Sequence, residues 1–116
     1  MKIRYEWVGK NVRPYIRDKE GYKKYCDSDR ALALCYWMSG EGNPNNSFVH
    51  ELLSLMAEAD ATGATATTRG DLLTFHVRAD EVEIVHPFSG DGFTYTHQEL
   101  RDEIGKWRQA WRKYRR

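Results

Sequence analysis

The stretch LLTFHVRADEVEIVH, residues 72–86, decides the fold that this sequence predicts. Apolar and polar residues alternate on both sides of Ala79-Asp80, which is typical of two half-buried strands joined by a tight turn. A two-residue turn would place Val77 opposite Val82, Phe75 opposite Ile84, His76 opposite Glu83 and Arg78 opposite Glu81. Each pair joins apolar to apolar, or a basic or titratable side chain to an acid, so the pattern predicts an antiparallel hairpin. Ala-Asp is not a favoured turn dipeptide, which leaves open a slip of one residue with a longer loop.

Further strands are predicted on both sides of this hairpin. Residues 64–69, ATATTR, form a β-like run that Gly70-Asp71 separates from the hairpin, as in a meander. Residues 2–8, KIRYEWV, alternate as a half-buried strand does, and residues 12–16 continue the pattern after a turn. Pro14 lies in that second run, and a proline is tolerated only at a sheet edge or in a loop. We therefore expect an antiparallel sheet of three to five strands.

Helices are predicted at three places. Residues 47–60 repeat apolar side chains at helical spacing. Residues 97–114 follow a capping box, THQE at residues 96–99, whose side chains satisfy the first backbone N–H groups. The largely apolar run at residues 28–39 fits a buried helix or a buried strand, and its alanines favour the helix. These elements predict a single α+β domain over residues 1–116, with the sheet packed against two or three helices.

The terminal helix is predicted to carry two stripes. An apolar stripe, within an arc of about 80°, contains Leu100, Ile104, Trp107, Trp111 and Tyr114. The flank beside it contains Arg101, Arg108, Arg112 and Arg115. The rings are therefore expected to hold the core. The arginines either complement the helix dipole near the C-terminus or form a row that binds phosphates.

Composition places the chain among small globular domains. Its 116 residues, 41% of them apolar, fit one domain with a modest core. No stretch approaches the roughly 18 consecutive apolar residues that a membrane span needs, and the charged opening lacks the apolar region of a signal peptide. We therefore expect a cytoplasmic protein. Cys26 and Cys35 are predicted to be reduced, since two cysteines make neither a disulfide framework nor a metal-binding spacing.

The net charge of +1 hides three blocks of opposite sign. Residues 1–30 hold nine Lys/Arg and five Asp/Glu, residues 31–100 hold two and ten, and residues 101–116 hold seven and two. Such asymmetry can produce a directional field that steers a charged partner. Alternatively, the blocks neutralise one another in the folded chain.

No specific catalytic motif is present. His76 opposite Glu83 is the strongest candidate for an acid–base dyad, because a carboxylate orients an imidazole and raises its basicity. An exposed His/Glu pair across two strands is also ordinary sheet stabilisation, and no nucleophile with a recognisable signature accompanies it. In the predicted register His76 and His86 lie on opposite faces, so no metal site is expected. Glycine motifs that cradle phosphates are lacking too, and we expect neither an enzyme nor a cofactor.

Residues 51–91 form the acidic part of the chain, with eight Asp/Glu and two arginines. The turns and the polar strand face would bring together Asp71, Asp80, Glu81, Glu83 and Asp91, with His76 beside them. Such a surface repels nucleic acid and attracts a basic protein, for example a nuclease whose substrate cleft is positive. These six residues are the candidate partner-binding site. An acidic surface that is merely solvated is the alternative.

The order of these elements resembles that of the small bacterial immunity proteins of contact-dependent growth inhibition and related polymorphic toxin systems. The likeness spans most of the chain and rests on KIRYEW (residues 2–7), LTFHV (73–77), VEIVH (82–86) and THQEL (96–100). It implies a non-enzymatic cytosolic protein that binds and neutralises one toxin domain, often a nuclease, by covering its active site. Those proteins diverge so widely that the resemblance carries over no functional residue by position.

A small nucleic-acid-binding accessory domain is the alternative function. It would use the row Arg101, Arg108, Arg112 and Arg115, together with the basic residues Arg13, Arg17, Lys19, Lys23 and Lys24. Its affinity for nucleic acid would fall steeply with salt.

Overall fold

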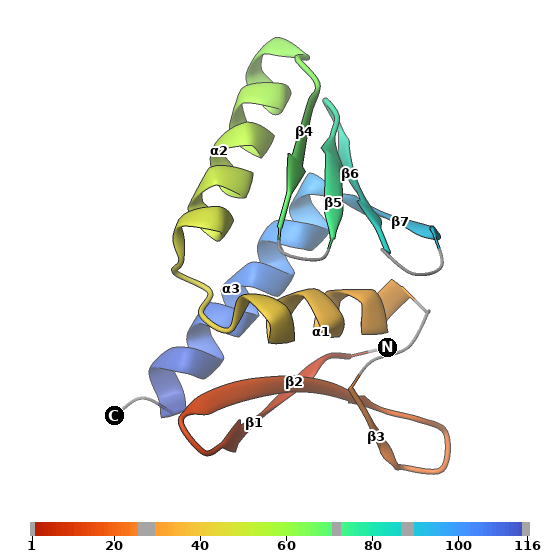
Figure 1. Cartoon of the computed structure of the whole chain (residues 1–116), viewed down its shortest axis with the longest axis vertical. Coiled ribbons are helices and arrows are strands. Elements are labelled where there is room, and N and C mark those ends of the chain that lie inside the picture. The colour runs from red at the N-terminus through yellow and green to blue at the C-terminus, as the bar shows by residue number, and fades with distance from the viewer. Residues whose placement is uncertain (1, 26–29, 71–72, 87–89, 115–116) are drawn as a thin grey trace.

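The computed structural model describes residues 2–25, 30–70, 73–86 and 90–114. In chain order its elements are β1 (Arg4–Val8), β2 (Asn11–Arg17), β3 (Lys23–Lys24), α1 (Arg30–Glu41), α2 (Ser47–Thr62), β4 (Ala66–Arg69), β5 (Thr74–Val77), β6 (Glu81–Val85), β7 (Gly92–Thr96) and α3 (His97–Tyr114). The predicted α+β class is confirmed, and the described residues form three helices and two antiparallel sheets, one of three strands and one of four (Figure 1).

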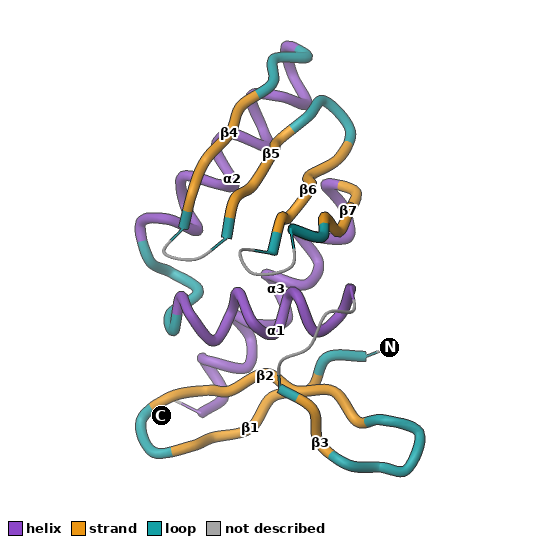
Figure 2. Tube along the Cα trace, turned by 45° about the vertical axis from the view of Figure 1, so that its right-hand side comes forward, coloured by secondary structure: helices purple, strands orange, loops and turns teal. Residues whose placement is uncertain are grey.

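The two sheets lie at opposite ends of the molecule, whose longest extent is 41 Å. The sheet with strand order β1-β2-β3 forms one end, and the sheet with order β4-β5-β6-β7 forms the other. Helix α1 crosses between them, while α3 runs from the four-stranded sheet to the β1–β2 hairpin (Figure 1). Figure 2 shows α2 and α3 together behind the four-stranded sheet. The strands were expected in one sheet, and α1 is the layer that divides them into two.

The hairpin at the centre of the sequence has the predicted register. Val77 pairs with Val82, Phe75 with Ile84, and His76 with Glu83. The Arg78 N–H donates a hydrogen bond to the Glu81 carbonyl at 2.8 Å, which closes a two-residue turn. The structure therefore has no slip of register. The four apolar members of these pairs are fully buried.

Strand β7 was not predicted. No strand was expected at residues 92–96, but Gly92 begins a strand that pairs with β6. Tyr95 lies opposite Val82 and is only 2% exposed, so this short strand adds an aromatic ring to the core. The run GFTYT alternates as a strand does, but it begins with a glycine, which is typical of turns, and its last residue, Thr96, is also the first residue of the capping box.

Pro14 lies in the middle strand of its sheet, where an edge strand or loop was expected. The strand β3 pairs only with Ile16 and Arg17, so it stops short of Pro14. On the side away from β1, β2 is therefore an edge at Pro14, and the missing N–H costs no ladder hydrogen bond there.

The apolar run after residue 28 forms the helix α1, which settles the choice between helix and strand. Its buried side chains include Cys35, Trp37 and Met38, each no more than 2% exposed. Because α1 lies between two sheets, both of its sides are covered, and this position explains its nearly continuous apolar sequence. Within the described ranges, none of the helices has the length and apolar character needed to cross a membrane. Cys26 lies outside those ranges, while Cys35 is a buried thiol.

Helix α3 begins at the predicted capping box. The Thr96 N–H donates to Glu99 Oε1 at 3.0 Å, and the Glu99 N–H donates to Thr96 Oγ1 at 3.1 Å. The predicted apolar stripe is buried from Leu100 to Trp111, and Tyr114 packs against it at the end. The rings of the helix therefore hold the fold, as predicted.

One hydrophobic cluster joins the two ends. At its centre the Trp37 ring of α1 lies 5.3 Å from Phe75 of β5 and 5.6 Å from Trp107 of α3, measured between ring centroids. The same cluster includes Val12 and Ile16 of β2. Both sheets thus share a single core.

Candidate functional site

One face of the four-stranded sheet is not covered by any of the helices in the described residues. Helices α2 and α3 pack against its other face (Figure 2), which carries the buried side chains. Strand alternation assigns to the uncovered face, here called the open sheet face, the residues Thr67, Arg69, Thr74, His76, Arg78, Glu81, Glu83, Val85, Thr94 and Thr96. All of these are exposed or half-buried, and most are polar. A flat polar surface of this kind suits contact with another macromolecule.

The structure brings together four of the six predicted partner-binding residues and places Asp91 at the opposite end of β6 from Asp80. His76, Glu81 and Glu83 lie on the open sheet face, and the turn between β5 and β6 contains the exposed Asp80. Asp91 is exposed in the loop that precedes β7. The sixth predicted residue, Asp71, lies outside the described residues.

The two glutamates of the open sheet face share one cation. The Arg78 guanidinium lies 3.1 Å from a Glu83 carboxylate oxygen and 3.6 Å from a Glu81 carboxylate oxygen. The three side chains are 30% to 42% exposed, so each pair contributes only about 0–1 kcal/mol to stability. Arg78 therefore offsets part of the negative charge of Glu81 and Glu83, but a competing cation can replace it with little loss of stability.

His76 and Glu83 lie opposite each other, as predicted, but each side chain forms a polar contact with a different residue. The His76 Nδ1 lies 3.1 Å from the Thr67 hydroxyl, while Glu83 accepts a hydrogen bond from Arg78. The pair is thus part of a cross-strand polar network of the kind that stabilises sheet surfaces. Among the described residues no cluster of three or more His, Cys, Asp or Glu side chains could hold a metal ion.

Gly92 belongs to the site, although the sequence alone did not single it out. A Cβ atom at this position would overlap the Glu83 carboxylate, so the side chain of Glu83 lies against the Gly92 backbone. The lack of a side chain on β7 therefore gives Glu83 room beside its neighbouring strand. A glycine at the start of a strand is a possible sequence signal for such a close approach.

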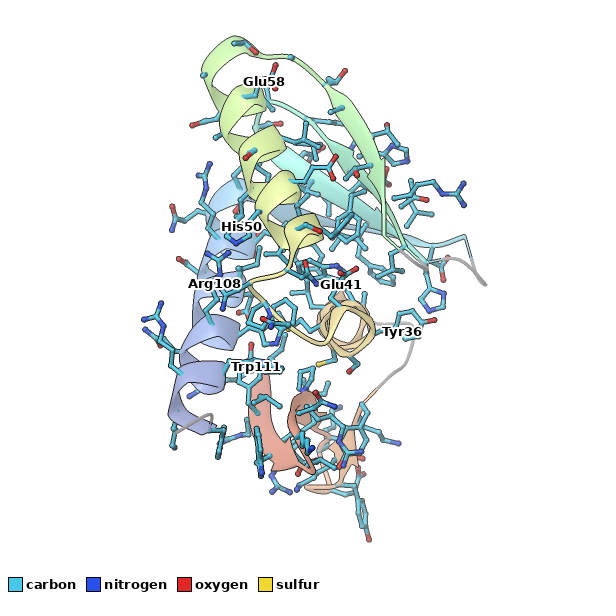
Figure 3. All side chains as sticks on the ribbon, turned by 60° about the vertical axis from the view of Figure 1, so that its left-hand side comes forward. Tyr36, Glu41, His50, Glu58, Arg108 and Trp111 are labelled. Atoms are coloured by element: carbon cyan, nitrogen blue, oxygen red, sulfur yellow. The ribbon has the colours of Figure 1, made fainter. Side chains whose placement is uncertain are left out.

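The arginine row on α3, the basis of the alternative function, is partly engaged within the fold. The Arg108 Nε donates a hydrogen bond to the Pro44 carbonyl at 3.2 Å, and Figure 3 shows Arg108 beside the loop between α1 and α2. Arg101 is half-buried and Arg112 is exposed, while Arg115 lies outside the described residues. Arg108 therefore tethers a loop, which the sequence alone did not indicate.

Three of the five basic N-terminal residues of that alternative also have partners. Glu6 accepts hydrogen bonds from Lys23 at 2.5 Å, from Arg13 at 2.8 Å and from the Tyr25 hydroxyl at 3.0 Å. The hydrogen bonds from Lys23 and Arg13 lower the pKa of Glu6 to about 2. Arg17 donates to the Gly21 carbonyl at 2.8 Å. Lys19 and Lys24 are exposed.

The charge blocks of the sequence are separated in space and do not interleave. Residues 2–25, at the three-stranded end, contain eight Lys/Arg and three Asp/Glu. The described residues of 47–96, at the four-stranded end, contain two Lys/Arg and seven Asp/Glu. We call these regions the basic end and the acidic end. Since residues 106–114 of α3 add four cations and no acid beside β1 and β2, the molecule is strongly polarised along its long axis.

Comparisons with known proteins yield no relative, since no protein-family model, curated protein or solved structure matches the chain. The resemblance to immunity proteins therefore remains a prediction from the order of the elements. What the chain does has to be inferred from its fold and its charge distribution.

Proposed function

We propose that this protein is a non-enzymatic cytoplasmic binding protein that captures a basic protein partner at its acidic end. The observation that carries the proposal is the open sheet face, a broad polar surface at the negatively charged end of a polarised molecule. An acidic surface attracts a positively charged partner over long distances and orients it before contact. The exposed Asp80 and Asp91 lie in loops next to this face, where they would form the rim of the contact.

Recognition would involve an exchange of cations on the open sheet face. A lysine or arginine of the partner would replace Arg78 beside Glu81 and Glu83, and the arrangement of Arg78 supports this because its ion pairs are exposed and weak. Charge pairs of this kind speed association and set specificity, while affinity comes from a buried centre. Thr67 and Thr94 add neutral hydroxyl groups to the same face. The open sheet face can therefore contact a partner without burying an excess of unpaired charge.

The resemblance to immunity proteins suggests the class of partner. A nuclease toxin must present a positive cleft to its phosphate-bearing substrate, and an acidic surface placed over that cleft would block the substrate. We therefore propose a toxin nuclease domain as the partner, with neutralisation by occlusion of the active site.

The test compares two triple charge reversals that change the net charge equally. Asp80→Lys, Glu81→Lys and Asp91→Lys alter the proposed contact, whereas Glu51→Lys, Glu58→Lys and Asp60→Lys alter exposed positions on α2. The wild-type protein and both variants would capture partners from a nuclease-treated native lysate, and the affinity of the captured protein would be measured at two salt concentrations. We expect the first variant to lose the partner and the second to retain it.

The proposal also requires that the captured protein be toxic in the absence of this chain. Co-expression of the wild type should restore growth to cells that produce the partner, and the variant altered at Asp80, Glu81 and Asp91 should not. Equal loss of binding in both triple variants would show that only net charge matters. Unchanged binding in the first variant would remove the open sheet face from the contact.

A further inference from the structure

We propose that a cleft at the opposite end of the molecule binds the phosphodiester backbone of a single-stranded nucleic acid. The cleft has a volume of about 510 Å³ and lies between β1, β2 and the C-terminal half of α3. Ten of the described residues line this basic cleft: Lys2, Ile3, Arg4, Tyr5, Tyr15, Lys106, Gln109, Ala110, Lys113 and Tyr114. None of these ten belongs to the arginine row of α3 or to the acidic end.

The basic cleft gathers positive charge from two distant parts of the sequence. Lys2 and Arg4 come from the start of the chain, while Lys106 and Lys113 come from α3. Among the described residues that line it there is no Asp or Glu, and Lys2, Arg4 and Lys113 form no ion pair with a described acid. Lys106 pairs with Glu103 at 3.1 Å. The cations around the cleft repel one another, and a bound polyanion would offset this repulsion.

The spacing of these cations favours a chain of phosphates over a single phosphate ion. Lys106 and Lys113 are seven residues apart on one helix, a separation of roughly 10 Å along its axis. Lys2 and Arg4 are two residues apart, at most roughly 7 Å along the chain. Positions spread over this length on two separate elements match successive phosphates of a strand that follows the cleft better than one phosphate group.

Aromatic rings in and beside the cleft favour a nucleic acid over an acidic peptide. Tyr114 lines it, as do Tyr5 and Tyr15, whose rings pack mainly into the fold, Tyr15 being only 8% exposed. Tyr114 also stacks on Trp7, with ring centroids 6.2 Å apart and planes inclined by 19°, and Trp7 remains 42% exposed. Proteins that bind single strands combine a positive groove with aromatic side chains on which bases stack, and a peptide rich in Asp and Glu gains nothing from such stacking.

The experiment uses fluorescence anisotropy with a labelled twelve-nucleotide oligouridylate. The double variant Arg4→Gln and Lys113→Gln removes two cations of the cleft, while Lys19→Gln and Lys24→Gln removes two exposed cations that do not line it. We expect wild-type binding that weakens steeply with salt, and a salt slope lower by about 1.4 in the cleft variant, because each of the two lost cations contributes about 0.7 on a single strand. The cleft variant should bind at least about tenfold more weakly at low salt, and the control variant within about twofold of wild type.

Four outcomes would overturn the inference. They are absence of oligouridylate binding at low salt, an equal loss of affinity in both double variants, equally tight binding of a duplex of the same length, and equal competition by polyglutamate of matched charge. The last outcome would indicate an acidic protein segment as the occupant. Because the four altered residues are exposed, thermal unfolding should occur at the same temperature in all three proteins, which excludes misfolding as the cause of lost binding.

Discussion

The two sheets share one core but depend on different interactions. In the four-stranded sheet, Phe75, Val77, Val82 and Ile84 pair across the strands and are completely buried. The three-stranded sheet has a third strand of only two residues, and a polar network centred on Glu6 joins its strands. Hydrophobic burial thus provides most of the stability of the sheet at the acidic end, whereas ion pairs add to the stability that burial provides at the basic end.

This difference also separates the two proposed binding surfaces. Ion pairs on the open sheet face can be replaced by ion pairs with a partner at little cost in stability, because the stability of the four-stranded sheet comes from the opposite face. At the basic end, Glu6, Arg13 and Lys23 are already committed to one another. Lys2, Arg4 and Lys113 of the cleft lie outside that network and are available to a ligand.

Replacing Trp107 with alanine should cause the largest loss of stability, because Trp107 lies where the two ends of the core meet. Trp107 is fully buried and contacts Trp37 on the helix between the two sheets. We expect Trp107→Ala to lower the free energy of unfolding by about 3–5 kcal/mol, because it leaves a cavity at the junction. Urea unfolding followed by circular dichroism would measure the loss.

A matched control is Trp7→Ala, which removes the same side chain from a position 42% exposed and should cost much less. Hydrogen exchange on Trp107→Ala would then show whether the two ends lose protection together. If one sheet remained protected while the other exchanged, the idea of one shared core would be wrong.

The sequence predicted those elements whose signal is local. The register of β5 and β6 followed from alternation on both sides of a two-residue turn, and the start of α3 followed from a four-residue capping box. The stripe of rings on α3 was confirmed for the same reason, since a period of 3.6 residues can be read within one segment.

Features that depend on distant contacts were not predictable. The division into two sheets results from α1 lying between them, which no local pattern records. The hydrogen bond from Arg108 to Pro44 joins positions 64 residues apart. The basic cleft combines Lys2 and Arg4 with residues more than a hundred positions later, so its charges appeared in the sequence only as two separate basic blocks.

The polar network at the basic end should make stability depend on pH between about 2 and 4.5. The pKa of Glu6 is lowered from 4.5 to about 2, so its contribution is present above pH 4.5 and is lost as the pH falls toward 2. Solvent screens the exposed Arg13 and Lys23, and we expect Glu6→Gln to cost only about 1 kcal/mol at pH 7. Urea unfolding at pH 7, 4 and 2.5 would measure the difference from wild type, which should shrink as the pH falls.

Glu20→Gln is the control for this pH dependence, because Glu20 is an exposed acid in the same sheet's hairpin loop and has no ion pair with a described residue. Its unfolding free energy should follow the wild type at every pH. A difference between Glu6→Gln and wild type that stayed constant from pH 7 to pH 2.5 would mean that Glu6 stabilises the sheet by packing and not by its charge.

The smallest expected effect is a coupling between Gly92 and Glu83 at the acidic end. Alanine at position 92 gains from the reduced freedom of the unfolded chain, but its Cβ forces the Glu83 carboxylate away from the strand and from Arg78. In the wild-type background these effects should nearly cancel, whereas with Glu83→Ala in place Gly92→Ala should stabilise the protein by about 0.5–1 kcal/mol. A double-mutant cycle from urea unfolding would measure this coupling. Equal effects of Gly92→Ala in both backgrounds would show that the position of the Glu83 side chain does not depend on the space beside Gly92. Glu83 could then turn toward a partner whatever residue occupies position 92 of β7.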